Sequence, residues 1–81
     1  MKARVFVSLK TTVLDPQGKT VRAALQGLGY SAVEDVRQGK FFDIAVASGV
    51  TREQARKDIE IIAHDVLANP VIEEYRVELL D

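Results

Sequence analysis

Two periodicities of apolar residues alternate along this chain, and they constrain its fold more than any other feature. Apolar residues recur at every second position in 2–10, 40–47 and 71–80, as they do in strands that bury one face. Between these segments, 16–28 and 51–68 repeat apolar residues at the three- and four-residue spacing of an amphipathic helix. The sequence therefore predicts strands and helices in alternation, with little chain left for linkers.

The first expected helix, 16–28, has signals at both ends. Asp15 is suited to accept hydrogen bonds from the free N–H groups of the first turn, and Pro16 fits the first helical position. Gly29 can adopt the left-handed conformation that often ends a helix. The apolar stripe that we expect to be buried consists of Val21, Ala24, Leu25 and Leu28.

The second expected helix, 51–68, begins with a capping box, because Thr51 is followed three residues later by Gln54. Asn69-Pro70 should end it, since the residue before a proline disfavours helix. The stripe that we expect to be buried consists of Ala55, Ile59, Ile62, Ala63, Val66 and Leu67.

The segment 32–47 has two interpretations. Gln38-Gly39 can form a tight turn, which would divide the segment into a hairpin of 32–37 and 40–47. Alternatively, the whole segment is one long bent strand. Its second half is the clearer strand, because Phe42, Ile44 and Val46 alternate with other side chains.

With the hairpin, the element order is β-α-β-β-α-β. This order predicts a two-layer, ferredoxin-like α+β fold with an antiparallel sheet and both helices on one face. The open face of the sheet would carry Phe6, together with Phe41 or Leu80. Apolar groups on an open face indicate a covered surface, so we expect self-association as a dimer or a higher oligomer.

Composition excludes several classes of protein. The 81 residues predict a single domain, 1–81, with a modest core, and 47% of them are hydrophobic. There is no cysteine, which removes disulfides and thiolate metal sites. A net charge of −1 and a pI of about 5.8 give no general attraction to nucleic acid or to an anionic membrane. No apolar run is long enough to cross a membrane and no signal peptide is evident, so we expect a cytoplasmic protein.

The residues give little support for chemistry. Gly18-Lys19-Thr20 follows a strand, as in a phosphate-binding loop, but Val13 stands where the first glycine of such a loop is needed. His64 is the only histidine and points away from the apolar stripe of its helix. RNA-recognition modules share the predicted element order, yet Lys40 and Ala45 occupy two of the positions that need aromatic residues. We therefore predict no catalytic, cofactor-binding or metal-binding residue.

Three segments resemble the PurS family, the small subunits of phosphoribosylformylglycinamidine synthase. They are VFVSLKTTVLDPQGKTVRAALQGLGY, VEDVRQGKFFDI and LANPVIEEYRVEL, and they follow one another in the family's order over nearly the whole chain. The motifs VLDPQG, DVRQGK and LANPVIE are specific in combination. Residues 47–66 carry no recognised signature.

The resemblance implies a non-catalytic subunit of a ligase of purine biosynthesis. In such systems a glutaminase subunit releases ammonia, and a large synthetase subunit uses ATP and Mg to activate formylglycinamide ribonucleotide. The small subunit joins the two and binds no cofactor of its own. We expect turns to contact these partners, at Asp15, Pro16, Gly18, Arg37, Gly39, Lys40, Asn69, Pro70 and Val71.

A regulatory domain of the ACT type is the alternative, since it shares the strand-helix order and binds a small metabolite. Its first loop usually depends on glycine for close approach of the ligand. Here that loop holds Thr11, Thr12, Val13 and Leu14.

Overall fold

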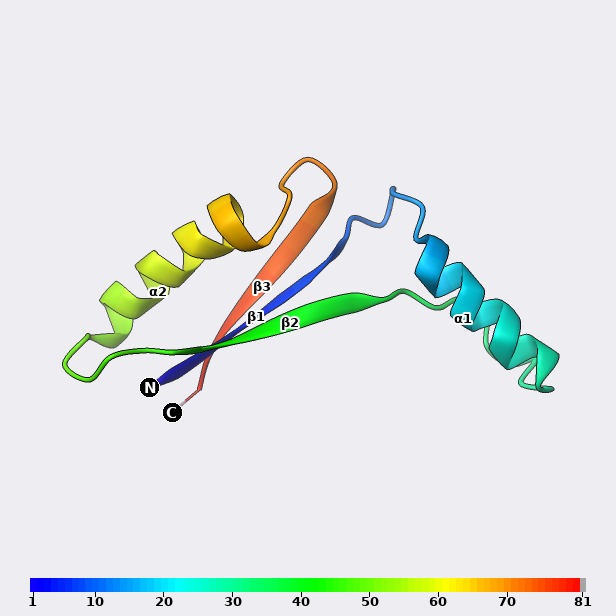
Figure 1. Ribbon diagram of the computed structural model, residues 1–81, viewed down its shortest axis with the longest axis horizontal. Helices are drawn as coiled ribbons and strands as arrows, with labels where there is room; N and C mark the ends of the chain where they lie inside the picture. Colours follow the sequence, from blue (N-terminus) through cyan, green and yellow to red (C-terminus); the bar gives the residue numbers. More distant parts are fainter. Residues whose placement is uncertain (81) are drawn as a thin grey trace.

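The computed structural model describes residues 1–80 and consists of three strands and two helices, one of which ends in a wider turn (Figure 1). The expected domain ends at Asp81, which lies outside the described residues. The elements are β1 (Lys2–Leu9), α1 (Pro16–Gly27), β2 (Gly39–Ala45), α2 (Arg52–Ile62), the π-helical turn η1 (Ala63–Leu67) and β3 (Glu73–Leu80).

The three strands form one antiparallel sheet in the order β2-β1-β3. Val5 of the central strand lies opposite Phe42 on one side and Val77 on the other. β1 is central, and its alternation places Ala3, Val5 and Val7 on one face, where at most 2% of their surface is exposed. The strands that the sequence predicted at both ends and in 40–47 are therefore confirmed.

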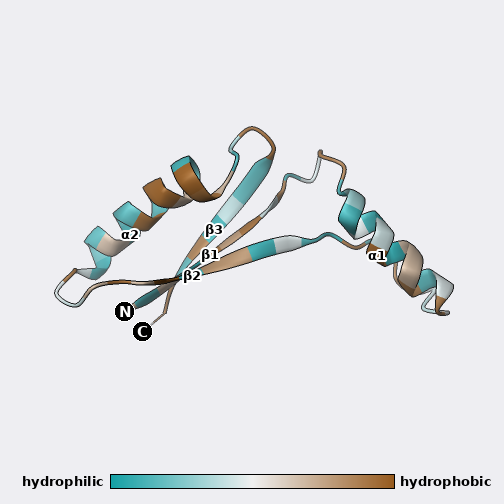
Figure 2. Cartoon of the chain, viewed as in Figure 1, coloured by the Kyte–Doolittle hydropathy of each residue, from teal (hydrophilic) through white to brown (hydrophobic). Residues whose placement is uncertain are grey.

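Helix α2 covers the face of the sheet that carries these buried residues. Ile59 and Ala63 pack into the same core, and half-buried side chains of β2 and β3 surround them. Within residues 1–80, no helix lies over the opposite face of the sheet (Figure 1). Apolar residues are concentrated in the second half of α2 and η1 (Figure 2).

The predicted start of the second helix is confirmed, because the Thr51 side chain accepts a hydrogen bond from Gln54 N at 3.1 Å. Its predicted stripe is only partly correct. Ile62 is 36% exposed. Val66 is 73% exposed, although Ala55, Ile59 and Ala63 are buried. The reason is the π-helical turn, in which Ala68 N bonds to Ala63 O five residues back and residues no longer follow the 3.6-residue spacing.

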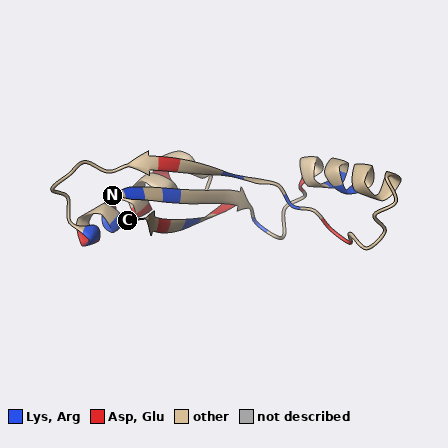
Figure 3. Ribbon diagram, turned by 90° about the horizontal axis from the view of Figure 1, so that it is seen from below, with Lys and Arg blue, Asp and Glu red and all other residues tan. Residues whose placement is uncertain are grey.

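Helix α1 begins and ends as the sequence predicted. Asp15 is the N-cap, Pro16 is the first helical residue, and Gly29 has a φ of +99°. The helix does not lie over the sheet of its own chain, however, but projects beyond its end (Figures 1 and 3). The molecule is consequently elongated, with principal extents of 51 × 27 × 14 Å.

The segment between α1 and β2 forms neither the predicted hairpin nor a long strand. Residues 32–37 do not form a strand. Instead, the Val33 backbone bonds to residues in and just after α1: its N–H donates to Tyr30 O, and its carbonyl accepts from the Gln26 side chain. The predicted α+β, ferredoxin-like class with an antiparallel sheet is confirmed. The chain differs from it in having the order β-α-β-α-β and only one helix on its own sheet.

Candidate interaction surfaces

The open face of the sheet is a patch of aromatic rings and guanidinium groups. The Phe6 and Phe41 rings lie 6.1 Å apart on β1 and β2. The Arg76 guanidinium lies 4.4 Å from the centre of the Phe6 ring, and that of Arg4 lies 4.8 Å from the centre of the Phe41 ring. Phe41 is 57% exposed, so this face presents a large apolar group to its surroundings. We call these four residues the open-face patch.

Both arginines of the open-face patch are paired with carboxylates. Arg4 binds the Asp43 carboxylate with two nitrogens, at 2.7 and 3.2 Å, and Arg76 pairs with Glu78. The hydrogen bond from Arg4 holds the pKa of Asp43 below its ordinary value and raises that of Arg4. Charges of both signs are interspersed on the strands (Figure 3). A flat surface of exposed aromatic and arginine side chains with local charge pairs is typical of protein–protein contacts.

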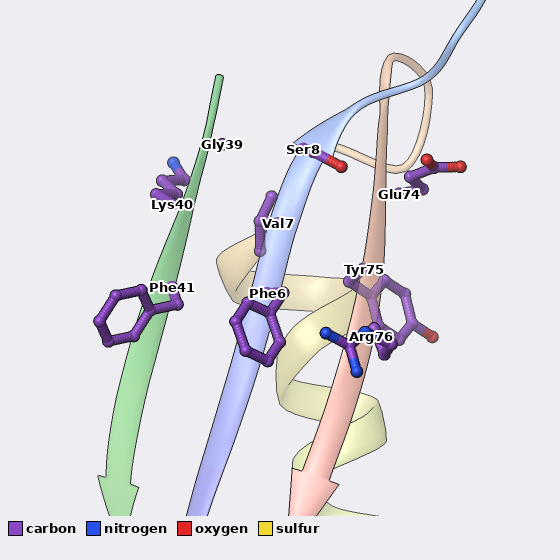
Figure 4. Close-up of a pocket in the computed structure, with 9 residues that line it drawn as sticks. All are labelled: Phe6, Val7, Ser8, Gly39, Lys40, Phe41, Glu74, Tyr75 and Arg76. Carbon is purple, nitrogen blue, oxygen red and sulfur yellow. The ribbon is translucent and has the colours of Figure 1, made fainter. Parts of the chain in front are cut away.

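A shallow hollow of about 560 Å³ lies at one end of the open-face patch (Figure 4). Figure 4 shows Phe6 and Phe41 side by side on neighbouring strands, with the Arg76 side chain next to Phe6. The hollow is lined by Phe6, Val7, Ser8, Gly39, Lys40, Phe41, Glu74, Tyr75 and Arg76. The first strand's Phe6 was expected on this face from the sequence. The alternation of the strands places Arg4 on the same face as Phe6 and Arg76 on the same face as Leu80. Only the structure shows the contacts of the two arginines with the aromatic rings.

The second candidate surface is the exposed stripe of α1. Leu28 is 74% exposed and Val21 is 40% exposed, although the sequence predicted that this stripe would be buried. Leu14 and Tyr30, which flank the helix, are each 60% exposed. From here on, the α1 stripe means the exposed residues Leu14, Val21, Leu28 and Tyr30. Nothing in the local sequence distinguishes a stripe that faces its own sheet from one that does not.

Asp15 connects α1 to the chain that enters β2. Its side chain is only 5% exposed, and its two carboxylate oxygens accept from Gly18 N at 2.9 Å and from Gln38 N at 2.7 Å. These two N–H groups, that of Gln38 first, lower the pKa of Asp15 from its ordinary value of 3.8. The residue therefore caps the helix and also holds a segment more than 20 residues away.

Arg37 makes a second connection at the same place. One nitrogen of its guanidinium donates to Lys10 O at 2.9 Å and to Val13 O at 2.8 Å. Gly18 permits the close packing between these segments, because a Cβ there would lie 2.2 Å from Val36 O. We refer to Asp15 and Arg37 as the latch, and to residues 16–38, which they hold, as the arm.

The remaining predicted contact residues lie at the turn before β3 and at the start of β2. The Asn69 side chain accepts from Val71 N at 3.1 Å, and Val71 is 78% exposed. Gly39 and Lys40 are exposed at the edge of the hollow. Lys10 N bonds to Ile72 O at 2.9 Å, which brings this turn against the end of β1.

All nine residues that the sequence singled out as partner contacts therefore gather at one end of the sheet. Their roles within the chain differ, because Asp15 and Gly18 are buried whereas Lys40 and Val71 are exposed. Among residues 1–80, no group of three or more His, Asp or Glu side chains is placed to hold a metal ion. No helix in this part of the chain is long and apolar enough to cross a membrane.

The fold and its surfaces define a class of protein, namely small α+β domains that expose apolar surface outside their own core. This chain has an aromatic open face, an amphipathic helix that projects beyond its own sheet with apolar residues exposed, and a cluster of turns at one end. The chain belongs to the PurS family, since the model of that family, described as phosphoribosylformylglycinamidine (FGAM) synthase, matches residues 2–81.

Individual relatives agree with this assignment. Phosphoribosylformylglycinamidine synthase subunit PurS of Bacillus subtilis (strain 168) is 40% identical, in an alignment that covers 96% of this chain and 90% of that protein. The crystal structure of PurS from Methanocaldococcus jannaschii, one of the subunits of formylglycinamide ribonucleotide amidotransferase in the purine biosynthetic pathway, is 36% identical. It superposes with a TM-score of 0.84 over 95% of this chain and 92% of its own.

A third relative has been solved as part of an assembly. A chain in the structure of PurLQS from Thermotoga maritima is 30% identical, with a TM-score of 0.86 over 98% of this chain and 95% of its own. The family match favours a subunit of phosphoribosylformylglycinamidine synthase over a regulatory domain of the ACT type.

Proposed function

We propose that this chain is the small, non-catalytic subunit of the phosphoribosylformylglycinamidine synthase of purine biosynthesis. It joins the glutaminase subunit to the large synthetase subunit, so that ammonia from glutamine reaches formylglycinamide ribonucleotide. ATP and Mg serve the large subunit, and the chemistry takes place on the two larger chains. The observation that carries the proposal is the similarity, over nearly the full length, to a chain of PurLQS.

A physical reason favours a separate joining subunit. Ammonia that escapes into water at neutral pH is protonated, and the ammonium ion is not a nucleophile. Two active sites held at a constant separation protect the transfer. The chain offers contact surfaces for this purpose: the open-face patch, the α1 stripe and the turns at the end of the sheet. We assign the turns to the catalytic partners, because Lys40 and Val71 are exposed there.

Self-association is the second part of the proposal. A compact chain of this length has a radius of gyration of about 12 Å, whereas that of this chain is 16.2 Å. A ferredoxin-like sheet is covered by two helices, whereas this sheet is covered by α2 alone. The helix missing from it is α1, whose apolar stripe is exposed. If α1 of each copy covers the apolar sheet face of the other, a two-fold dimer buries both the stripe and the uncovered part of the sheet.

The test of the joining function is a synthase assay with the large subunit and the glutaminase, with and without this chain. We expect the chain to be required when glutamine is the nitrogen donor. Ammonium chloride at high concentration should support the reaction of the large subunit without it, because bulk ammonia bypasses the transfer between subunits. Full glutamine-dependent activity without the chain would contradict the proposal.

The contact residues are tested by changing exposed side chains. Lys40→Glu and Val71→Asp should weaken co-purification with the two catalytic subunits. Lys57→Glu is the matched control, since Lys57 is exposed on α2, away from the turns. If the control weakens the complex as much as the other two variants do, the turns are not the contact.

A further inference from the structure

The direction of the arm is set by very few side chains. Between the end of β1 and the start of β2, the latch supplies two long-range connections. Asp15 holds Gln38 N, and Arg37 holds the carbonyls of Lys10 and Val13. Both connections join the chain entering the arm to the chain leaving it. They therefore act where the arm meets the sheet.

The same sequence has a competing arrangement. If Gln38-Gly39 formed a turn, 32–37 would return along β2 as a fourth strand, and α1 could then pack on its own sheet. The latch opposes that turn, because Gln38 N is bonded to Asp15 and the Arg37 side chain points back to the first loop. The close approach of Gly18 to Val36 further ties the segment to α1 rather than to β2.

We propose that Asp15 and Arg37 are positioning residues that select the open arm over a closed monomer, and thereby determine that the α1 stripe is received by a second copy of the chain. This inference rests on the self-association proposed above. It assigns to the latch a role distinct from contact with the catalytic subunits. Asp15 is 5% exposed, so its carboxylate is not available to a partner.

The chemistry of Asp15 allows its two roles to be separated. An asparagine or a serine at this position keeps one side-chain oxygen, which is sufficient to cap the helix at Gly18 N. Neither residue provides the second acceptor that Gln38 N requires. Asp15→Asn and Asp15→Ser therefore remove the Asp15 half of the latch while they retain the cap. Asp35→Asn is the matched control, because Asp35 is an exposed acid in the same segment and its loss changes the charge equally.

The experiment compares these variants and Arg37→Gln with the unaltered chain by amide hydrogen exchange and by sedimentation. We expect exchange at the Gln38 amide to be at least about tenfold faster in the latch variants. The dissociation constant of self-association should rise at least about tenfold, and the control should match the unaltered chain. Circular dichroism establishes that α1 remains helical, and Arg37→Gln tests the latch at a site that leaves the helix cap unchanged.

Small-angle scattering supplies a readout that does not depend on association. Closure of the arm in latch-variant monomers should reduce the radius of gyration from the 16.2 Å of the open chain toward about 12 Å. If the unaltered chain is monomeric at all concentrations, the proposed self-association is wrong. Amide exchange at Gln38 and the radius of gyration from scattering then still test whether the latch holds the arm open. Self-association of the latch variants equal to that of the unaltered chain, or unchanged exchange at Gln38, would overturn the inference.

Discussion

Truncation of Leu28 tests whether the α1 stripe is an interface between two copies. Leu28 lies at the C-terminal end of α1 and is 74% exposed in the single chain. Leu28→Ala should leave the fold of that chain nearly intact, because the side chain has few neighbours to lose. If the stripe is covered in the assembly, the same change should weaken self-association.

The size of the effect follows from the exposed fraction. Leu→Ala removes three carbon atoms, each of which contributes about 0.8 kcal/mol when it is buried. Scaled by the 74% that the single chain leaves exposed, this is about 1.8 kcal/mol for each copy. A two-fold dimer carries the change twice, so the loss approaches about 3.6 kcal/mol, or roughly 400-fold in the dissociation constant.

Sedimentation equilibrium over a range of concentrations measures this constant directly. Lys19→Ala is the matched control, because Lys19 lies on the opposite side of the same helix and has a helix propensity close to that of alanine. Its truncation should leave the dissociation constant nearly unchanged. A change of less than about threefold for Leu28→Ala, with the helix intact, would refute the assignment of the α1 stripe.

Three further outcomes are expected. Gly18→Ala should loosen the arm and lower the free energy of unfolding, measured by urea melts, because its Cβ would lie 2.2 Å from Val36 O. Ile59→Ala, at a core position that is 3% exposed, should cost about 2–5 kcal/mol of unfolding free energy. Asp15 and Asp43 have a lower pKa in the folded chain than the ordinary 3.8 of the unfolded chain. Their contribution to stability is therefore present above pH 3.8 and is lost as the pH falls through their folded pKa. Urea melts at acid pH should show the free energy of unfolding decreasing below about pH 3.8.

Each of these outcomes has a counterpart that should behave differently. Gly27→Ala places a Cβ where there is nothing within 4 Å, so it should be neutral or slightly stabilising. Ile61 is 59% exposed, and its truncation should cost far less than that of Ile59. Equal losses at Gly27 and Gly18, or at Ile61 and Ile59, would contradict the packing described here. A flat acid profile would contradict the role given to the two aspartates.

The local sequence was sufficient for features that depend on neighbours in the chain. Asp15 and Thr51 cap their helices as predicted, and Gly29 adopts the left-handed conformation. The alternation in β1 correctly placed Val5 and Val7 in the core. These features depend on hydrogen bonds and periodicities that span a few residues, so a single segment contains the information.

Tertiary structure decided where the elements lie relative to one another. The amphipathic pattern of α1 identified a face that needs cover but not the surface that covers it. The turn signal at Gln38-Gly39 was overridden, and the Gln38 amide bonds instead to Asp15, 23 residues earlier. Likewise, the π-helical turn exposed Val66 in a stripe that the 3.6-residue spacing had placed in the core. Local patterns determine which residues form a helix or a strand, whereas long-range hydrogen bonds and burial determine whether that element stays with its own sheet.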